Sequence, residues 1–174
     1  MVLAPGGGYG PDGPLLMFTA VAAERRGATP RPVTWDLEAD DVDAMVTSRV
    51  SAAVAELQAA GAGAPVIVGK SLGSAAAPVA ADHGLAAVWF TPLLTVEPVV
   101  AALKRATAPF LLAGGTADDY WDGDVARSLT SHVVEIPGLD HRMFAPGPLK
   151  ESAAALGEVI TAVERFLDDV VWPG

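Results

Sequence analysis

Short apolar segments alternate with longer amphipathic segments along this chain of 174 residues, and this alternation is the strongest constraint on its fold. Most of the apolar segments are rich in branched or aromatic side chains and end next to Gly or Pro, as buried strands do. We expect strands at residues 2–4, 32–35, 66–68, 87–90, 110–113 and 133–136. Strands that alternate with helices form right-handed βαβ units, so the sequence predicts a parallel sheet with helices on both faces.

The segments between these strands have the apolar period of helices. Asp40 and Asp41 can cap one helix. Its apolar positions are Val42, Val46, Val50, Val54 and Leu57. Further helices are expected at residues 15–26, 72–83, 96–106, 122–130 and 149–171. The prediction is an α/β fold, a three-layer α/β/α sandwich with a mostly parallel sheet of about six strands. These elements leave no room for a second domain, so we expect one domain over residues 1–174, with the stretch 59–65 as a connector.

Composition argues against several classes of protein. Hydrophobic residues make up 51% and charged residues 18% of the chain, which is typical of a protein with a core rather than of a disordered chain. The 11 basic and 21 acidic residues give a formal charge of −10, and a nucleic-acid partner would need a basic patch. No apolar run reaches the roughly 18 residues of a membrane span. The N-terminus has no signal-peptide pattern.

Cysteine is absent, which excludes disulfides and thiolate zinc sites and fits a cytoplasmic protein. We assign no metal and no cofactor. The expected partner is a small-molecule substrate, with neither nucleic acid nor membrane, and the oligomeric state is left open.

The stretch VIVGKSLGS, residues 66–74, matches two motifs that give Ser71 different roles. A phosphate-binding loop, G-x-x-x-x-G-K-[ST], would need a glycine at position 64, which is alanine, and an open loop where Pro65 and a β-branched strand stand. A nucleophile elbow, G-x-S-x-G, needs a strand, a sharp turn with small neighbours and a helix. Gly69 and Gly73 supply the small neighbours, so we interpret Ser71 as a nucleophile.

A serine hydroxyl needs a base, and the chain has three histidines. His83 lies at the end of a predicted helix, and His132 opens a strand at the edge far from Ser71. His141 follows the strand 133–136, at the carboxyl edge of the sheet where ligands bind, so we choose His141.

The base in turn needs a carboxylate, and the segment LLAGGTADDYWD offers three at the end of the strand 110–113. We favour Asp118 over Asp119, with Asp122 a poorer third. For the oxyanion hole we choose the N–H groups of Leu72 and Gly7, with Gly8 and Tyr9 as alternatives to Gly7.

Taken together, VGKSLGS, GGTADD, GLDHRM and the glycine-rich LAPGGGYGPDGPL resemble motifs of the α/β-hydrolase superfamily. Lys70 and the small size are similar to its dienelactone-hydrolase-like branch, which includes the Tex30/KANL3-type proteins. The resemblance implies a minimal α/β-hydrolase fold that lacks two initial strands. The short segment after residues 87–90 implies that no lid covers the site.

The expected function is therefore hydrolysis of a small ester or thioester through an acyl-enzyme on Ser71. The alternative is a catalytically silent binding or scaffold protein with the same fold. Lys70 is either a surface lysine or a contact for an anionic substrate, and Tyr9 is a second possible substrate contact. The aromatic residues near strand ends either line a pocket or belong to the core; they are Trp89, Phe90, Trp121 and Phe144.

Overall fold

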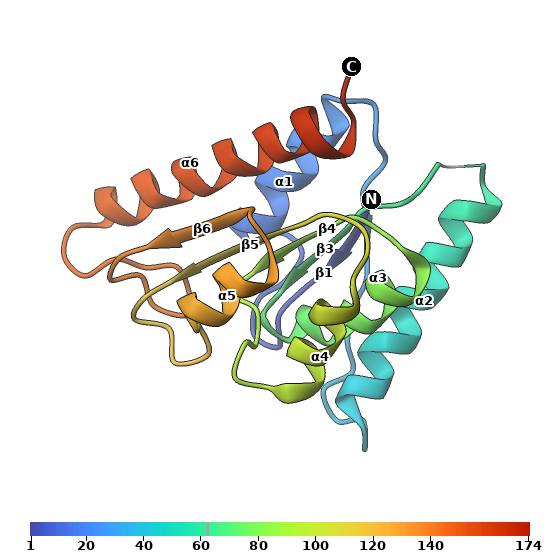
Figure 1. The fold of residues 1–174 in the computed structure, drawn as a ribbon, viewed down its shortest axis with the longest axis horizontal. Coiled ribbons are helices and arrows are strands. Elements are labelled where there is room, and N and C mark those ends of the chain that lie inside the picture. The colour runs from blue at the N-terminus through green and yellow to red at the C-terminus, as the bar shows by residue number, and fades with distance from the viewer. Residues whose placement is uncertain (62) are drawn as a thin grey trace.

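The computed structural model describes residues 1–61 and 63–174, and within them six strands form one sheet in which every pair is parallel (Figure 1). The strand order is β2-β1-β3-β4-β5-β6. The strands are β1 (Val2–Ala4), β2 (Arg31–Pro32), β3 (Ile67–Lys70), β4 (Ala87–Phe90), β5 (Phe110–Gly115) and β6 (Val133–Ile136). Because all strands run the same way, the loops after them meet at one edge of the sheet.

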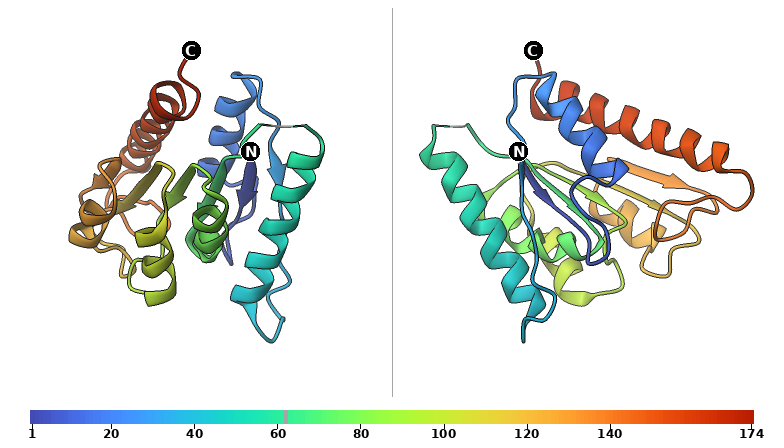
Figure 2. Two further views of the ribbon diagram at one scale, coloured as in Figure 1. Left: turned by 45° about the vertical axis from the view of Figure 1, so that its right-hand side comes forward. Right: turned by 180° about the vertical axis from the view of Figure 1, so that it is seen from behind.

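Helices cover both faces of the sheet and give three layers (Figures 1 and 2). They are α1 (Pro14–Glu24), α2 (Val42–Ala59), α3 (Ala77–His83), α4 (Glu97–Arg105), α5 (Gly123–Leu129) and α6 (Leu149–Phe166). Helices α1 and α6 pack on one face, whereas α2, α3, α4 and α5 pack on the other. The predicted three-layer α/β/α fold with a parallel sheet is confirmed.

The core is split by the sheet into two apolar layers. In β4, Ala87 and Trp89 pack into the layer beneath α2, α3 and α4, while Val88 and Phe90 pack into the layer beneath α1 and α6. Successive side chains of a strand point to opposite faces, so a strand covered on both sides must be apolar throughout. This requirement explains the continuous apolar runs in the sequence.

Two strands continue past the glycines at which we expected them to end. The strand β3 includes Gly69 and Lys70, and β5 includes Gly114 and Gly115. A Cβ on Gly69 would overlap the Trp89 ring. A Cβ on Gly114 would overlap the Trp121 ring. These glycines therefore make room for aromatic rings rather than ending the strands.

The edge strand β2 is shorter than the expected residues 32–35. It pairs with β1 at Arg31 and Pro32, and the Val33 N–H still donates to the Leu3 carbonyl at 3.0 Å. Proline cannot donate to a ladder, and it is tolerated in an edge strand. Trp35 leaves the strand and donates its indole N–H to the Pro5 carbonyl at 2.9 Å. The connector 59–65 contains residue 62, which lies outside the described residues.

The helix expected at residues 72–83 is divided. Residues Ser71–Ala76 form a 3₁₀ turn, η1, and α3 begins only at Ala77. Pro78 explains the division, because it has no N–H to donate to a carbonyl of the preceding turn. The long C-terminal helix is divided similarly, with α6 followed by a π-helical turn, η2 (Leu167–Val171).

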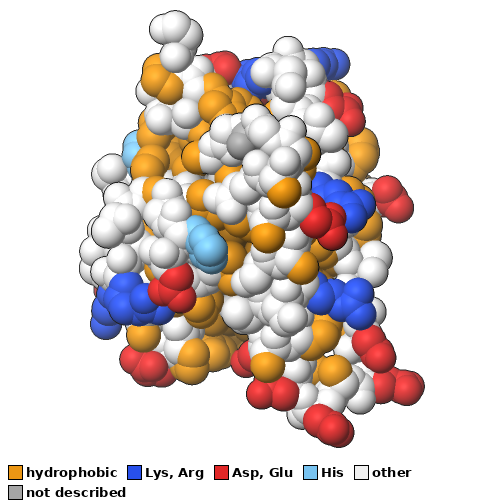
Figure 3. Space-filling view, turned by 90° about the vertical axis from the view of Figure 1, so that its right-hand side faces the viewer, with side chains coloured by type: hydrophobic (Ala, Val, Ile, Leu, Met, Phe, Trp, Pro, Cys, Tyr) orange, Lys and Arg blue, Asp and Glu red, His pale blue; other side chains and the backbone are white. Residues whose placement is uncertain are grey.

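Acidic residues begin two helices. Asp41 accepts the Ala44 N–H at the start of α2, as expected, and Asp122 caps α5 instead of forming its first turn. The segment before α2 also carries Asp36 and Glu38. Acidic side chains gather at the lower end of the face that includes α2 (Figure 3). Among the helices in the described ranges, none combines the length and apolar character of a bilayer span.

The packing predicts a large stability difference between two leucines. Leu112 in β5 is fully buried, whereas Leu149 at the start of α6 is 75% exposed. We expect Leu112→Ala to lower the free energy of unfolding by about 2–5 kcal/mol, because it removes buried methyl groups and leaves a cavity. The matched Leu149→Ala control should change it by less than about 0.5 kcal/mol. Urea denaturation of both variants measures the difference, and equal losses would contradict the described core.

Candidate active site

Three loops after β3, β5 and β6 bring Ser71, Asp118 and His141 together. Ser71 Oγ lies 2.7 Å from His141 Nε2. His141 Nδ1 lies 2.8 and 2.9 Å from the two carboxylate oxygens of Asp118. A carboxylate only accepts hydrogen bonds, so Nδ1 carries the proton in this pair and Nε2 is left to accept from Ser71. The three side chains form a continuous hydrogen-bonded chain.

The backbone at Ser71 is left-handed, with φ of 51°. Packing holds it in place: a Cβ on Gly73 would overlap the Ala4 carbonyl, so the turn after Ser71 lies directly on β1. Ser74 Oγ donates to the Ser71 carbonyl at 2.7 Å and accepts the Leu93 N–H at 3.1 Å. Ser74 therefore ties the turn to the loop after β4, a contact that the sequence reasoning did not anticipate.

The loop after β5 presents Asp118 and not Asp119 to His141. The Asp118 side chain has no exposed surface, and its Oδ1 accepts the Tyr120 N–H at 2.9 Å. Asp119 is exposed. The Ala117 N–H donates to the Leu139 carbonyl at 3.0 Å, so the loop with the carboxylate is bonded directly to the loop with the histidine.

His141 lies in a tight turn that Asp140 organises. Asp140 Oδ1 accepts the N–H groups of Arg142 and Phe144 at 2.9 and 2.8 Å, and the Asp140 N–H donates back to the Phe144 carbonyl. The Tyr120 ring lies 5.1 Å from the His141 ring, measured between centroids. The imidazole is thus held by its turn, by Asp118 and by an exposed aromatic ring.

The non-glycine residues with positive φ in the described ranges all follow strands, at the carboxyl edge of the sheet. They are Ser71, Thr91 and Met143, with φ of 51°, 41° and 67°. Thr91 follows Phe90, which pairs with Lys70 in the neighbouring strand, and the buried Oγ1 of Thr91 has no hydrogen-bond partner among the described residues. A β-branched residue in this region is strained, and such strain concentrates at functional sites. No signal in the sequence identified Thr91 or Met143.

The two N–H groups predicted for an oxyanion hole lie in neighbouring segments. Leu72 is the second residue of η1, so its N–H has no acceptor within the helix. Gly7 lies against the Leu72 side chain, since a Cβ on Gly7 would be 3.8 Å from Leu72 Cδ2. The Gly6 N–H is already bonded to the Tyr9 carbonyl at 2.9 Å. The oxyanion roles of Leu72 and Gly7, and the alternatives Gly8 and Tyr9, stay predictions.

Tyr9 is half-buried beside this loop, and its hydroxyl accepts the Leu15 N–H at 2.7 Å. Burial raises the pKa of the Tyr9 hydroxyl. The predicted contact of Tyr9 with a substrate stays a prediction, because its hydroxyl already holds the start of α1.

Lys70 is not a surface lysine, contrary to one of our two interpretations. Its side chain is buried, with 3% of the residue exposed, and Nζ donates to the His141 carbonyl at 3.0 Å. Burial lowers the pKa of Lys70 to about 8, although Asp118 and Asp140 favour the charged form. The pattern G-K-S gave no sign of this burial, because the contact joins residues far apart in the chain.

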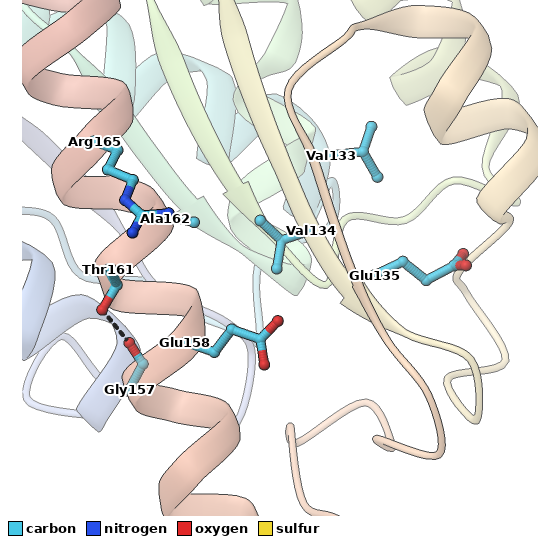
Figure 4. A pocket seen from close by; sticks show the side chains of 8 residues that line it. All are labelled: Val133, Val134, Glu135, Gly157, Glu158, Thr161, Ala162 and Arg165. Atoms are coloured by element: carbon cyan, nitrogen blue, oxygen red, sulfur yellow. Dashed lines mark hydrogen bonds between the residues drawn. The ribbon is translucent and has the colours of Figure 1, made fainter.

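The other two histidines lie apart from this cluster. His83 is exposed at the end of α3, and His132 precedes β6 and packs against Phe166. Trp89, Phe90 and Trp121 belong to the core, whereas Phe144 is 48% exposed. A groove of about 450 Å³ lies between β6 and α6, where Val134, Glu158 and Arg165 point toward it, and none of the site residues line it (Figure 4).

The burial of Lys70 predicts a pH dependence of stability. An ordinary lysine has a pKa of 10.5, and burial lowers that of Lys70 to about 8. Between these values the unfolded chain holds a proton that the folded protein has released, so the free energy of unfolding rises with pH. We expect the wild type to gain stability relative to Lys70→Met from about pH 8 to about pH 10. Urea denaturation at each pH measures this difference. If the free energy of unfolding changed with pH equally in both proteins, the lowered pKa of Lys70 would be contradicted.

No protein-family model and no curated protein matches this chain in sequence. Solved structures do match its fold. An alpha-beta serine hydrolase homologue from Coxiella burnetii has a TM-score of 0.75 at 16% identity, covering 96% of this chain and 83% of that chain. An α/β serine hydrolase without a lid from Xanthomonas campestris has a TM-score of 0.68 at 15% identity, covering 95% and 79%.

A third match is Est1E from Butyrivibrio proteoclasticus with ferulic acid bound, with a TM-score of 0.76 at 13% identity, covering 98% of this chain and 88% of that chain. At these identities the comparison concerns the fold alone. The parallel sheet with helices on both faces is shared with these structures, and the chain has the α/β-hydrolase fold.

Proposed function

We propose that this protein is a serine hydrolase that cleaves a small ester or thioester through an acyl-enzyme intermediate. One observation carries the proposal: Ser71, His141 and Asp118 form a continuous hydrogen-bonded chain from three strand ends. The fold shared with serine hydrolases supports it. The order of the three residues along the chain, Ser-Asp-His, is that of the α/β-hydrolases.

In the first half of the reaction, Ser71 Oγ attacks the substrate carbonyl while its proton passes to His141 Nε2. Asp118 keeps the Nδ1 proton in place and stabilises the imidazolium. The carbonyl oxygen becomes an oxyanion, which the N–H groups of Leu72 and Gly7 would accept. As the bond to the leaving alcohol or thiol breaks, His141 returns the proton to that group, and the acyl group stays on Ser71.

In the second half, water replaces the alcohol. His141 Nε2 takes a proton from water, and the resulting hydroxide attacks the acyl carbonyl. Collapse of the second tetrahedral intermediate breaks the bond to Ser71 Oγ, which regains its proton from His141. The products are a carboxylic acid and the free enzyme, so the cycle needs no other reactant.

The surroundings of the site support a small substrate. Only residues 91–96 connect β4 to α4, which is too short for a helical cap. Around the cluster, the exposed apolar surface includes Tyr120 beside His141 and Phe144 in the same turn as His141. We propose that the chain belongs to the small lidless, dienelactone-hydrolase-like branch of the superfamily, which includes the Tex30/KANL3-type proteins, and its short loops support this.

Replacement of the nucleophile tests the proposal directly. We expect Ser71→Ala to lower the hydrolysis rate of a short p-nitrophenyl ester by about 10³-fold or more, because the triad acts as a unit. Ser128→Ala is the matched control, since Ser128 is an exposed serine on α5. A fluorophosphonate probe should label the wild type and Ser128→Ala, and it should not label Ser71→Ala.

Full activity in Ser71→Ala would contradict the assignment of Ser71. If the folded wild type neither hydrolyses esters nor accepts the probe, the alternative of a catalytically silent binding protein is favoured.

A second pair of variants distinguishes the two neighbouring aspartates. We expect Asp118→Asn to lower kcat by about 10²–10⁴-fold, because an amide can no longer hold the required tautomer of His141. The Asp119→Asn variant makes the same chemical change on an exposed side chain and should keep nearly full activity. Steady-state ester hydrolysis measures both, and a larger loss in Asp119→Asn would reverse the assignment.

A further inference from the structure

The reaction proposed above makes no use of Lys70, although this lysine lies at the centre of the cluster. It is the last residue of β3 and directly precedes Ser71. Burial of an amino group costs free energy unless the group makes hydrogen bonds. Here Nζ donates to the backbone carbonyl of His141, 71 residues further along the chain, at 3.0 Å. This bond ties the strand that carries the nucleophile to the turn that carries the base.

The same side chain also contacts the glycine-rich loop after β1. Lys70 Nζ lies 5.3 Å from the centre of the Tyr9 ring, over its face. A Cβ on Gly6 would lie 3.2 Å from Lys70 Cδ, so the loop backbone packs on the lysine stem. Lys70 thus stands between the predicted oxyanion loop and the turn of His141.

The charged groups around Nζ are mixed in sign. Asp118 and Asp140 favour the ammonium, while Arg142 opposes it. Within the described residues, Lys70 Nζ is bonded to a neutral carbonyl and the Asp118 carboxylate to His141, so no direct ion pair joins Lys70 and Asp118. An ammonium that donates to a carbonyl is also not a base for Ser71. Its burial leaves little of the group accessible to a substrate anion.

The bonds within the turn of His141 fix its shape but not its distance from β3. Among the described residues, the hydrogen bonds of Asp140 are to neighbours in the same turn, and the Leu139 carbonyl accepts from the loop of Asp118. We propose that Lys70 is a positioning residue that holds the His141 backbone against β3 and the glycine-rich loop, so that Nε2 stays within reach of Ser71 Oγ. The expected effect of Lys70 on the reaction rate rests on the proposed function.

The test compares the wild type with Lys70→Met, which keeps the length and volume of the side chain but cannot donate. Lys104→Met is the matched control, because Lys104 is exposed on α4. We expect the rate constant of fluorophosphonate labelling at pH 7 to fall about 10- to 100-fold in Lys70→Met, the loss typical of a misplaced catalytic group. The Lys104→Met variant should label at the wild-type rate.

Thermal unfolding separates positioning from a general loss of structure. Lys70→Met removes a buried charge and a hydrogen bond, whose effects on stability oppose each other. We therefore expect the midpoint of unfolding to change by no more than about 4 °C while labelling slows. A collapse of the fold that accounts for the loss of labelling would overturn the positioning role.

Nuclear magnetic resonance tests the position of His141 without any reaction. The proton on Nδ1, shared with Asp118, should give a low-field signal that Asp118→Asn abolishes. We expect this signal to shift or broaden in Lys70→Met and to stay unchanged in Lys104→Met. If the wild type does not react with the probe, the proposed function fails and this signal alone decides the role of Lys70. An unchanged signal in Lys70→Met, or wild-type labelling by that variant, would overturn the inference.

Discussion

A serine with a left-handed backbone between a strand and a helix is strained by about 1–3 kcal/mol, and the surrounding structure has to hold it there. In this protein the turn at Ser71 is held by close backbone packing of Gly73 on β1 and by the hydroxyl of Ser74. The turn places Ser71 Oγ at the carboxyl edge of the sheet, within hydrogen-bond distance of His141. The rest of the cluster is arranged around this fixed point.

The neighbouring loops are also held by contacts with other segments. The sheet fixes where each loop begins, while hydrogen bonds between loops fix the positions of the functional side chains. The Ala117 N–H bonds to the Leu139 carbonyl, and Lys70 bonds to the His141 carbonyl. These two hydrogen bonds, one between backbone groups and one from a lysine side chain to a backbone carbonyl, link the segments that carry Ser71, Asp118 and His141. Ser71 and Asp118 are more than forty residues apart in the chain. Strand order alone would not give hydrogen-bond geometry.

Local sequence patterns were sufficient for the fold and for the three residues of the cluster. The apolar runs are dictated by burial on both faces of a parallel sheet, so they mark the strands, and a residue just after a strand must lie at the carboxyl edge. Strand and helix ends were less predictable. Gly69 and Gly114 resembled strand ends because the rings that occupy their missing Cβ positions, those of Trp89 and Trp121, come from elsewhere in the chain.

The burial of Lys70 and the strain at Thr91 were not predictable for the same reason. The surroundings of Lys70 are the turn of His141 and the ring of Tyr9, which the sequence places far from it. The backbone of Thr91 is set by its position between β4 and the segment that Ser74 holds. Lysine is not a residue type that indicates burial, and threonine is not one that indicates a positive φ. Both features arise from contacts that form only when the loops meet at the edge of the sheet.

The short connection between β4 and α4 has a consequence for the electrostatics of the site. The described segment of residues 91–96 is too short to form a cap, so in the proposed reaction bulk water would reach the substrate carbonyl. Water raises the local dielectric constant, which weakens each hydrogen bond to a developing negative charge. In the proposed reaction, catalysis would therefore depend on dipoles that are oriented before the substrate arrives, rather than on the exclusion of water from the substrate. Strained turns and buried bonds between loops are the means by which a small open protein keeps those dipoles oriented.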